Sequence, residues 1–266
     1  EPDGHFSYEE VAVLWYAPGT APDYLWTDLE DDGGTLAKSV QALDIDGTYV
    51  PVVGDFDRDR CSDILWYGVG TAPDLLWWGG ETGFTPGVPI SVSGSYRPVS
   101  GFFGGAAPGV FWYAPNGAES VWRGTGNRAQ PFASAAAKQV SGRDYQPVGY
   151  YDAGSLVQQI LWYTPGAGAD AVWAFTASGA HAKTYSTSLP GTYRTAACGS
   201  RVYLHAPGAA ADYVFSSLSL TSQSQLGPLP ISGSFRVASS HDTYQCTVVW
   251  HAPGSAPDAI WLPFVP

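Results

Sequence analysis

The sequence has no methionine, only three cysteines and few charged residues. Charged residues make up 14% of the 266 positions, and 24 acidic residues outnumber 12 basic ones, so the net charge is −12. Because nucleic-acid phosphates are bound by clustered Lys and Arg, this balance argues against a nucleic-acid partner. No apolar run is long enough to predict a membrane span. Since the initiating methionine is missing, we expect a processed secreted protein or one domain of a longer chain.

What the sequence does contain is one hairpin phrase repeated six times. An aromatic strand, a turn rich in Pro and Gly, and a second strand recur at VLWYAPGTAPDYLW (13–26), ILWYGVGTAPDLLW (64–77), VFWYAPNGAESVW (110–122), ILWYTPGAGADAVW (160–173), VYLHAPGAAADYVF (202–215) and VVWHAPGSAPDAIW (248–261). Successive copies lie 42 to 51 residues apart. This period with strand-forming residues is typical of a β-propeller, in which each repeat is one four-stranded blade.

The composition also indicates an all-β fold. Gly and Pro make up 53 residues and aromatic residues 14%, with no helical periodicity. In the second repeat, strand-like phrases at 47–56, 63–68, 74–79 and 83–92 alternate with turns, and the last phrase carries the prolines that an outer edge strand tolerates. We therefore predict a single domain over residues 1–266, a six-bladed β-propeller of four-stranded antiparallel blades.

One blade is expected to be incomplete where the two ends of the chain meet. Between the second aromatic of one repeat and the first aromatic of the next, 31 to 40 residues intervene, whereas the two chain ends together supply 20. The junction therefore lacks residues for about one strand of the four that a blade contains.

Ten of the eleven tryptophans occupy two positions of the repeat. Both faces of a blade are covered by neighbouring blades, so we expect most of these rings to be packed in the core. The tyrosine that follows the first tryptophan is replaced by His205 and His251 in the last two repeats, and Leu204 stands where the fifth repeat should have a tryptophan. We expect both histidines to be packed and hydrogen-bonded.

One acidic residue recurs in every repeat, seven or eight residues after the first aromatic position. It is either a turn cap that accepts backbone N–H groups, or it binds sugar hydroxyls while the neighbouring tryptophan stacks on the sugar ring. The presence of the acid in every copy favours the cap, although a multivalent lectin would also repeat its site. The candidate ligand-binding residues are Asp23, Trp26, Asp74, Trp77, Glu119, Trp122, Asp170, Trp173, Asp212, Asp258 and Trp261.

The positions of the cysteines favour one disulfide. Cys198 ends the innermost-strand phrase of the fifth repeat, and Cys246 precedes Trp250 of the sixth by four residues. Both positions fall near the same loop face of adjacent blades, so we predict a Cys198–Cys246 disulfide and a free Cys61. The alternative is three unpaired buried thiols.

The segment GDFDRDRCSDILWY (54–67) holds closely spaced carboxylates. Asp55, Asp57, Asp59 and Asp63 follow a D-x-D-x-D-x-x-x-D pattern, and the backbone carbonyl of Cys61 could supply another oxygen. Calcium takes about six to eight oxygen ligands, and carboxylates this close repel one another without a cation. We refer to residues 55–63 as the acidic loop. It is a candidate calcium site, and the alternative is a surface loop held by hydrogen bonds.

The acidic loop resembles that of the FG-GAP or VCBS-type repeat of integrin-like propellers, and the hairpin resemblance extends over all six repeats. The resemblance implies a β-propeller with calcium-assisted blades. It implies no single activity, since members include adhesion modules, sugar-binding modules and appendages of secreted enzymes. Arg60 stands where the family usually has glycine, and the other five copies of the loop lack the series of acids. At most one calcium is therefore expected.

No catalytic motif and no metal-binding histidine spacing is present. We expect a secreted, non-catalytic binding module that recognises carbohydrate, as a lectin does, or a cell surface through several propeller sites. The alternative is a structural or assembly subunit of a secreted adhesion or toxin complex, in which a protein partner completes the last blade. A polysaccharide-active enzyme is less favoured, because no paired acid and base stand apart from the repeat.

Overall fold

The computed structural model describes residues 11–31, 36–80, 83–115, 117–141, 144–152, 157–208, 210–215, 225–229, 233–239, 247–254 and 257–261. Every named element in these ranges is a β-strand. None of the described segments forms a helix with the length and apolar character needed to cross a membrane. The chain divides into two compact units, Glu1–Tyr49 and Val50–Pro266.

The first unit contains one antiparallel sheet made of β1 (Val13–Trp15), β2 (Asp23–Asp31) and β3 (Leu36–Leu43). In this sheet the ring centroids of Trp15 and Trp26 lie 4.9 Å apart. The turn after β1 is closed by a pair of backbone hydrogen bonds between Gly19 and Gly47. Gly19 has a φ of +102°, a conformation that glycine adopts without steric cost.

The second unit contains five antiparallel sheets. Their strands are β4 (Tyr49–Gly54), β5 (Asp63–Gly68), β6 (Leu75–Trp78) and β7 (Thr85–Pro86); β8 (Arg97–Gly101), β9 (Ala107–Tyr113), β10 (Ser120–Gly124) and β11 (Phe132–Ala136); β12 (Gln146–Asp152), β13 (Val157–Tyr163), β14 (Asp170–Phe175) and β15 (His181–Thr187); β16 (Arg194–Cys198), β17 (Arg201–His205), β18 (Asp212–Phe215) and β19 (Gln225–Leu229); β20 (Arg236–Ser239), β21 (Val248–His251) and β22 (Ala259–Trp261). With the first sheet this makes six antiparallel sheets, one for each hairpin phrase, so the all-β prediction is confirmed.

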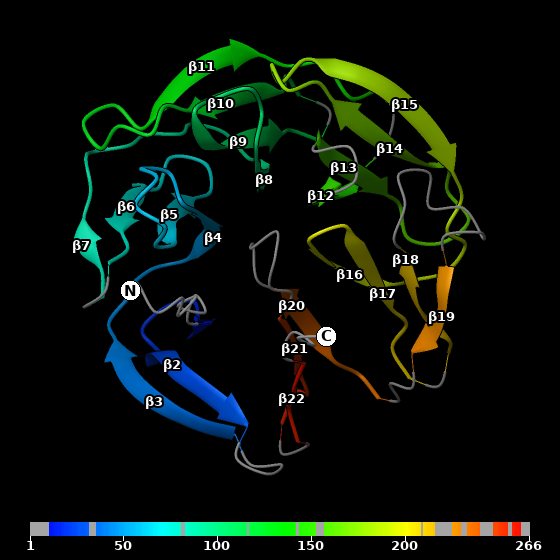
Figure 1. Cartoon of the computed structure of the whole chain (residues 1–266), viewed down its shortest axis with the longest axis horizontal. Coiled ribbons are helices and arrows are strands. Elements are labelled where there is room, and N and C mark those ends of the chain that lie inside the picture. Colours follow the sequence, from blue (N-terminus) through cyan, green and yellow to red (C-terminus); the bar gives the residue numbers. More distant parts are fainter. Residues whose placement is uncertain are drawn as a thin grey trace, which may run out of the picture. The chain divides into compact units, whose positions relative to one another are not determined.

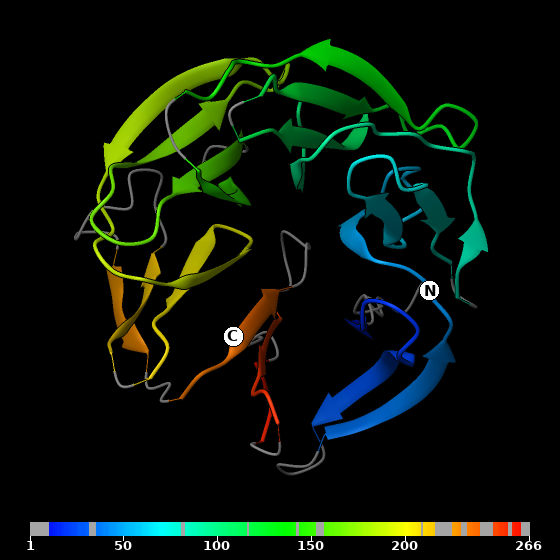
Figure 2. The same cartoon turned by 180° about the vertical axis from the view of Figure 1, so that it is seen from behind.

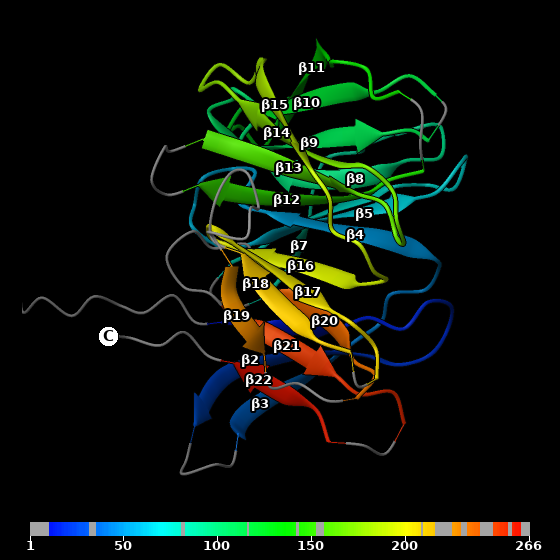
Figure 3. The same cartoon turned by 90° about the vertical axis from the view of Figure 1, so that its right-hand side faces the viewer.

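Within the second unit the sheets follow one another in chain order (Figure 1). The first strands are innermost, and contacts join β8 to β12, β12 to β16 and β16 to β20. Seen from behind, the last strands lie on the outside of the unit (Figure 2). From the side, β8, β9, β12 and β13 cross the unit roughly side by side, with paired strands running in opposite directions and connecting loops at both ends (Figure 3). At each of these two ends, turns of neighbouring sheets therefore lie close together.

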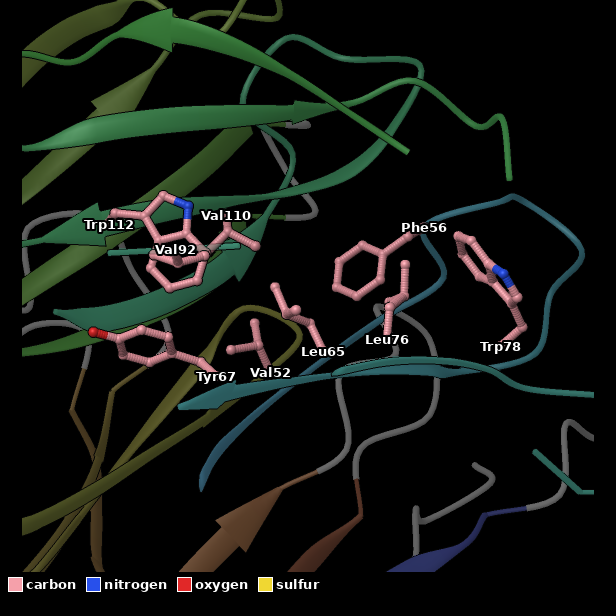
Figure 4. Packing of buried hydrophobic residues seen from close by; sticks show 9 residues of the cluster. All are labelled: Val52, Phe56, Leu65, Tyr67, Leu76, Trp78, Val92, Val110 and Trp112. Atoms are coloured by element: carbon pink, nitrogen blue, oxygen red, sulfur yellow. The ribbon is translucent and has the colours of Figure 1, made fainter. Parts of the chain in front are cut away.

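Strand alternation explains how the repeated aromatics hold neighbouring sheets together. Successive residues of a strand point to opposite faces, so Trp112 of β9 packs toward Tyr67 of the preceding sheet while Tyr113 packs toward Trp162 of the following one. The ring centroids are 5.1 Å apart in both pairs, in T-shaped geometry. Figure 4 shows Trp112 above Tyr67, with Leu65 beside it. The expectation that these rings are core residues is met here.

The tyrosine of the repeat also ties each hairpin to the next sheet. The Tyr67 hydroxyl donates to the Gly94 carbonyl at 2.5 Å and accepts the Tyr96 N–H at 3.0 Å. The Tyr163 hydroxyl makes the corresponding bonds to Gly191 and Tyr193, both at 2.8 Å. A buried hydroxyl that both donates and accepts leaves no unpaired polar group at this position.

The described residues test the predictions about the cysteines and the chain ends only in part. Cys198 is disulfide-bonded and Cys61 is free. Cys246 lies outside the described residues, so the Cys198–Cys246 pairing stays a prediction. The first and last sheets have three described strands each. The incomplete junction concerns residues 1–10 and 262–266, which also lie outside the described ranges.

Candidate functional site

Five of the six repeated acids are buried turn caps. Asp170 accepts the backbone N–H of Thr164 at 2.7 Å with one carboxylate oxygen and that of Leu189 at 2.7 Å with the other. Asp23 and Asp74 make the same pair of bonds in their own sheets, and Glu119 accepts the Val140 N–H. Together with Asp212 these acids are at most 8% exposed. The geometry therefore gives them the capping role that the sequence favoured.

Histidine joins the cap in the last two sheets. His205 Nδ1 lies 2.9 Å from Asp212 Oδ1, and both side chains are fully buried. His251 and Asp258 repeat this 2.9 Å contact, but there both side chains are more than one third exposed. The two Tyr-to-His replacements thus come with a new bond to the neighbouring acid, in agreement with the expectation that both histidines are hydrogen-bonded.

The neighbouring tryptophans pack against nearby side chains. Lys38 Nζ lies 4.2 Å from the Trp26 ring centroid, and Lys138 Nζ lies 4.7 Å from that of Trp173. Trp77 packs beside Phe84, and the remaining rings of this position pack in the same manner: Trp122 on Phe132 and Trp261 on Trp250. Five of the repeated acids are buried and so are not presented to a ligand beside these rings: Asp23, Asp74, Glu119, Asp170 and Asp212.

The acidic loop connects β4 to β5 and is tightly hydrogen-bonded. Asp55 accepts the N–H groups of Arg58 at 2.6 Å and Arg60 at 3.2 Å. Both arginines have positive φ angles, +70° and +75°, a conformation that glycine adopts more readily than other residues. Asp57 and Asp59 accept the N–H groups of the residues two positions ahead, at 3.0 and 2.8 Å.

Asp63 lies at the buried end of the loop. One oxygen accepts the Phe56 N–H at 2.7 Å and the other the Gly79 N–H at 2.9 Å. Burial raises the pKa of Asp63 to about 7, against the effect of these two hydrogen bonds and with help from the nearby Asp57. Burial raises the pKa of Asp55 as well. Unpaired negative charge in this loop is therefore costly.

Three of the five predicted ligand residues come together. Oxygens of Asp55, Asp57 and Asp63 lie within 4.8 Å of one another, so this triad could hold a metal ion. Asp59 turns away toward Arg128, a residue of the next sheet. Cys61 donates its N–H to Asp59. Arg128 also bonds to Asp57, which belongs to the triad, so the donor set fits a metal only in part.

Arg128 is not among the residues predicted from the sequence. It lies 71 positions from Asp57 in a different repeat, and no motif surrounds it. The one feature of the sequence that could have drawn attention to Arg128 is that basic residues are few in this acidic chain.

A small cavity lies between the sheets β8–β11 and β12–β15. Its volume is about 180 Å³, and its lining includes Phe102, Gly104, Tyr151, Gln158 and Thr176. The Phe102 side chain is unusual for a large apolar residue in that it is 42% exposed. Its ring centroid lies 6.3 Å from that of Tyr151, at an interplanar angle of 62°.

The buried Gln158 fixes the position of Phe102. Its side-chain carbonyl accepts the Phe102 N–H at 3.0 Å, and its amide nitrogen donates to the Tyr150 and Gln159 carbonyls, both at 3.0 Å. An added Cβ at Gly101 would lie 2.4 Å from the Gln158 amide carbon, so glycine is needed there for the glutamine to fit. The cavity wall is thus held by a fully bonded polar group.

No family model matches the chain, and no curated protein matches it in sequence. Solved structures do. AofleA from Arthrobotrys oligospora is 12% identical with a TM-score of 0.54, over 96% of this chain and 83% of that chain. TolB from Acinetobacter baumannii is 15% identical with a TM-score of 0.47, over 96% of this chain and 63% of that chain. At such low identity the AofleA match bears on fold alone, and with the six antiparallel sheets it confirms the predicted β-propeller.

Proposed function

We propose that this protein is a secreted, non-catalytic module that binds carbohydrate, and that the cavity beside Phe102 is its sugar site. A half-exposed aromatic ring fixed at the wall of a small cavity carries the proposal. The apolar face of a sugar ring packs on an aromatic ring, while its hydroxyls need hydrogen-bond partners. The backbone groups of Gly104 and Gly105, which also line the cavity, can supply these partners.

The size and charge of the cavity limit the class of ligand that it can bind. A volume of about 180 Å³ lies below the roughly 300–1,000 Å³ of typical ligand pockets, so we expect no more than one sugar ring to enter. The residues that line it carry no charge. A neutral monosaccharide unit, at a chain end or as a branch, is therefore the ligand class proposed, and charged sugars are disfavoured because no cation would pair with them.

Binding to a glycan array, followed by calorimetry with the sugars identified, tests this function. We expect neutral glycans to bind with and without calcium, and Phe102→Ala to weaken binding about tenfold or more, as loss of a central aromatic contact does. Leu75→Ala is the matched control, since Leu75 is exposed to a similar degree, 39%, on a different sheet. Absence of any glycan binding, or equal binding by the Phe102 variant, would overturn the proposal.

Secretion and the FG-GAP or VCBS-type relationship belong to the same proposal. The disulfide at Cys198 supports an oxidising compartment. The acidic loop and its left-handed turn at Arg60 support the family relationship. Recovery of the protein from the culture medium of its natural source, with the disulfide intact, tests the first point.

A further inference from the structure

Arg128 lies directly on the acidic loop although it belongs to the neighbouring sheet. It is part of the turn between β10 and β11. Its Nε donates to Asp57, and its Nη2 donates to Asp59 Oδ2 at 2.8 Å. The guanidinium also lies 5.5 Å from the Trp78 ring centroid. Asp57, the carboxylate it contacts most closely, is only 3% exposed.

The turn that carries Arg128 is held rigidly toward the loop. Thr125 Oγ1 donates to the Gln130 carbonyl at 2.5 Å, and Asn127 Oδ1 accepts the Ala129 N–H at 2.9 Å. Gly126, with a φ of +73°, sits against Arg58, where an added Cβ would lie 2.8 Å from Arg58 Cδ. The backbone that carries Arg128 is therefore held toward the acidic loop, and the planar guanidinium loses less freedom per hydrogen bond than a lysine ammonium would.

Every carboxylate oxygen of the acidic loop already has a donor. Asp55 and Asp63 are satisfied by backbone N–H groups alone. Asp57 and Asp59 each use one oxygen for the backbone and the other for Arg128. The guanidinium thus supplies the positive charge that such a loop otherwise takes from a metal ion, and a divalent cation beside it would be repelled.

The next junction along the chain shows the same contact without charges. Phe56 of the acidic loop packs on Phe132 of β11 at 5.0 Å, and Phe103 of the loop between β8 and β9 packs on Phe175 of β14 at 5.2 Å. At that second junction Gly104 touches the backbone of Ser178 directly, and residues 176–180 contain no arginine. In these two junctions the acids and the arginine are therefore present together or absent together.

We propose that Arg128 replaces the metal ion of this loop, so that the junction between sheets β4–β7 and β8–β11 is held by an internal cation and does not depend on calcium. The family resemblance implied a calcium there. The pairing of Asp57 and Asp59 with Arg128 is the disagreement on which this inference rests.

Thermal unfolding of the whole chain in EDTA and in millimolar calcium tests the proposal. We expect the wild-type Tm to change by less than about 1 °C between the two buffers, and Arg128→Gln to lower it in EDTA by about 2–4 °C. Calcium should then restore part of the loss, because the freed carboxylates can bind it. Arg128→Lys keeps the charge but not the forked geometry. Its Tm in EDTA should lie between those of the wild type and Arg128→Gln, and calcium should change it little.

Lys138→Gln is the matched control, since Lys138 also lies over an aromatic ring but far along the chain from the acidic loop. It should show no calcium response. Stoichiometric calcium binding to the wild-type protein by calorimetry, or calcium stabilisation of the wild type equal to that of the Gln variant, would overturn the proposal. So would an Arg128→Gln variant as stable as the wild type in EDTA.

Discussion

His205 Nε2 accepts the backbone N–H of Phe235 at 3.1 Å. This nitrogen must therefore be unprotonated, and the ring proton lies on Nδ1, where it is donated to Asp212. In the tyrosine-bearing sheets a hydroxyl accepts the corresponding N–H, as Tyr163 does from Tyr193. Histidine has thus kept the acceptor role of the tyrosine, and it bonds to Asp212 where the tyrosine donates to a glycine carbonyl.

Substitutions of His205 should separate the contribution of its hydrogen-bond acceptor to stability from the contribution of its ring. His205→Phe leaves the Phe235 N–H without an acceptor in a buried place and should cost about 1–3 kcal/mol of unfolding free energy. His205→Tyr restores the hydroxyl used elsewhere and should cost less than about 1 kcal/mol. Chemical denaturation measures both. Equal losses in the two variants would mean that the bond to Asp212 matters and the acceptor does not.

Removal of a turn cap should lower stability without touching ligand binding. Asp170→Ala leaves two backbone N–H groups unpaired, those of Thr164 and Leu189, and should cost about 2–4 kcal/mol. Asp258→Ala, at an acid whose side chain is 36% exposed, should cost less because water can replace the carboxylate. Urea unfolding measures the stability and a glycan array the binding. An Asp170 variant that keeps its stability but loses glycan binding would instead support the ligand role.

The missing tryptophan at Leu204 is compensated by a tyrosine. Tyr193 packs against Tyr213 at 6.2 Å, whereas Tyr96 packs against Trp112 at 5.8 Å in the corresponding place of another junction. Leu204→Trp should therefore overpack the core and cost about 1–3 kcal/mol. Adding Tyr213→Ala should recover part of that loss. Strictly additive effects in a double-mutant cycle would show that the two side chains do not share this space.

Asp63 should make stability depend on pH in the direction opposite to that of an ordinary salt-bridged acid. Its pKa in the folded protein is about 7, above the usual carboxyl value of 3.8, so between these two values the folded state binds more protons than the unfolded state. The free energy of unfolding should therefore fall as pH rises from about 4 to about 7 in EDTA. Asp63→Asn should flatten this slope. A slope that is unchanged by the substitution would assign the effect to other acids such as Asp55.

Local repetition made the fold predictable. Strand, turn and strand recur within each hairpin phrase, and the aromatic doublets such as Trp112 and Tyr113 have to face opposite neighbours because side chains alternate along a strand. The capping role of Asp170 could also be favoured in advance, because the acid and the turn it closes are six residues apart. These features depend on residues that are close in sequence.

The cavity beside Phe102 was not predictable in this way. Its lining comes from two loops and two strands of two repeats, and Phe102 occupies a position that the hairpin comparison does not cover. Gln158, 56 positions away, holds the Phe102 backbone in place. Spacing within a repeat contains no information about which turns of adjacent sheets meet at one end.

The sequence alone determined an all-β propeller with one acidic loop, because period, turn residues and alternation are written locally. Only the tertiary structure decided what satisfies that loop. Four neighbouring acids predict a cation but not its kind, and the fold brings Arg128 onto Asp57 from the adjacent sheet. The physical reason is that electrostatic attraction depends on the distance between charges in space. An arginine from another repeat can therefore pair with these carboxylates as closely as a bound metal ion would.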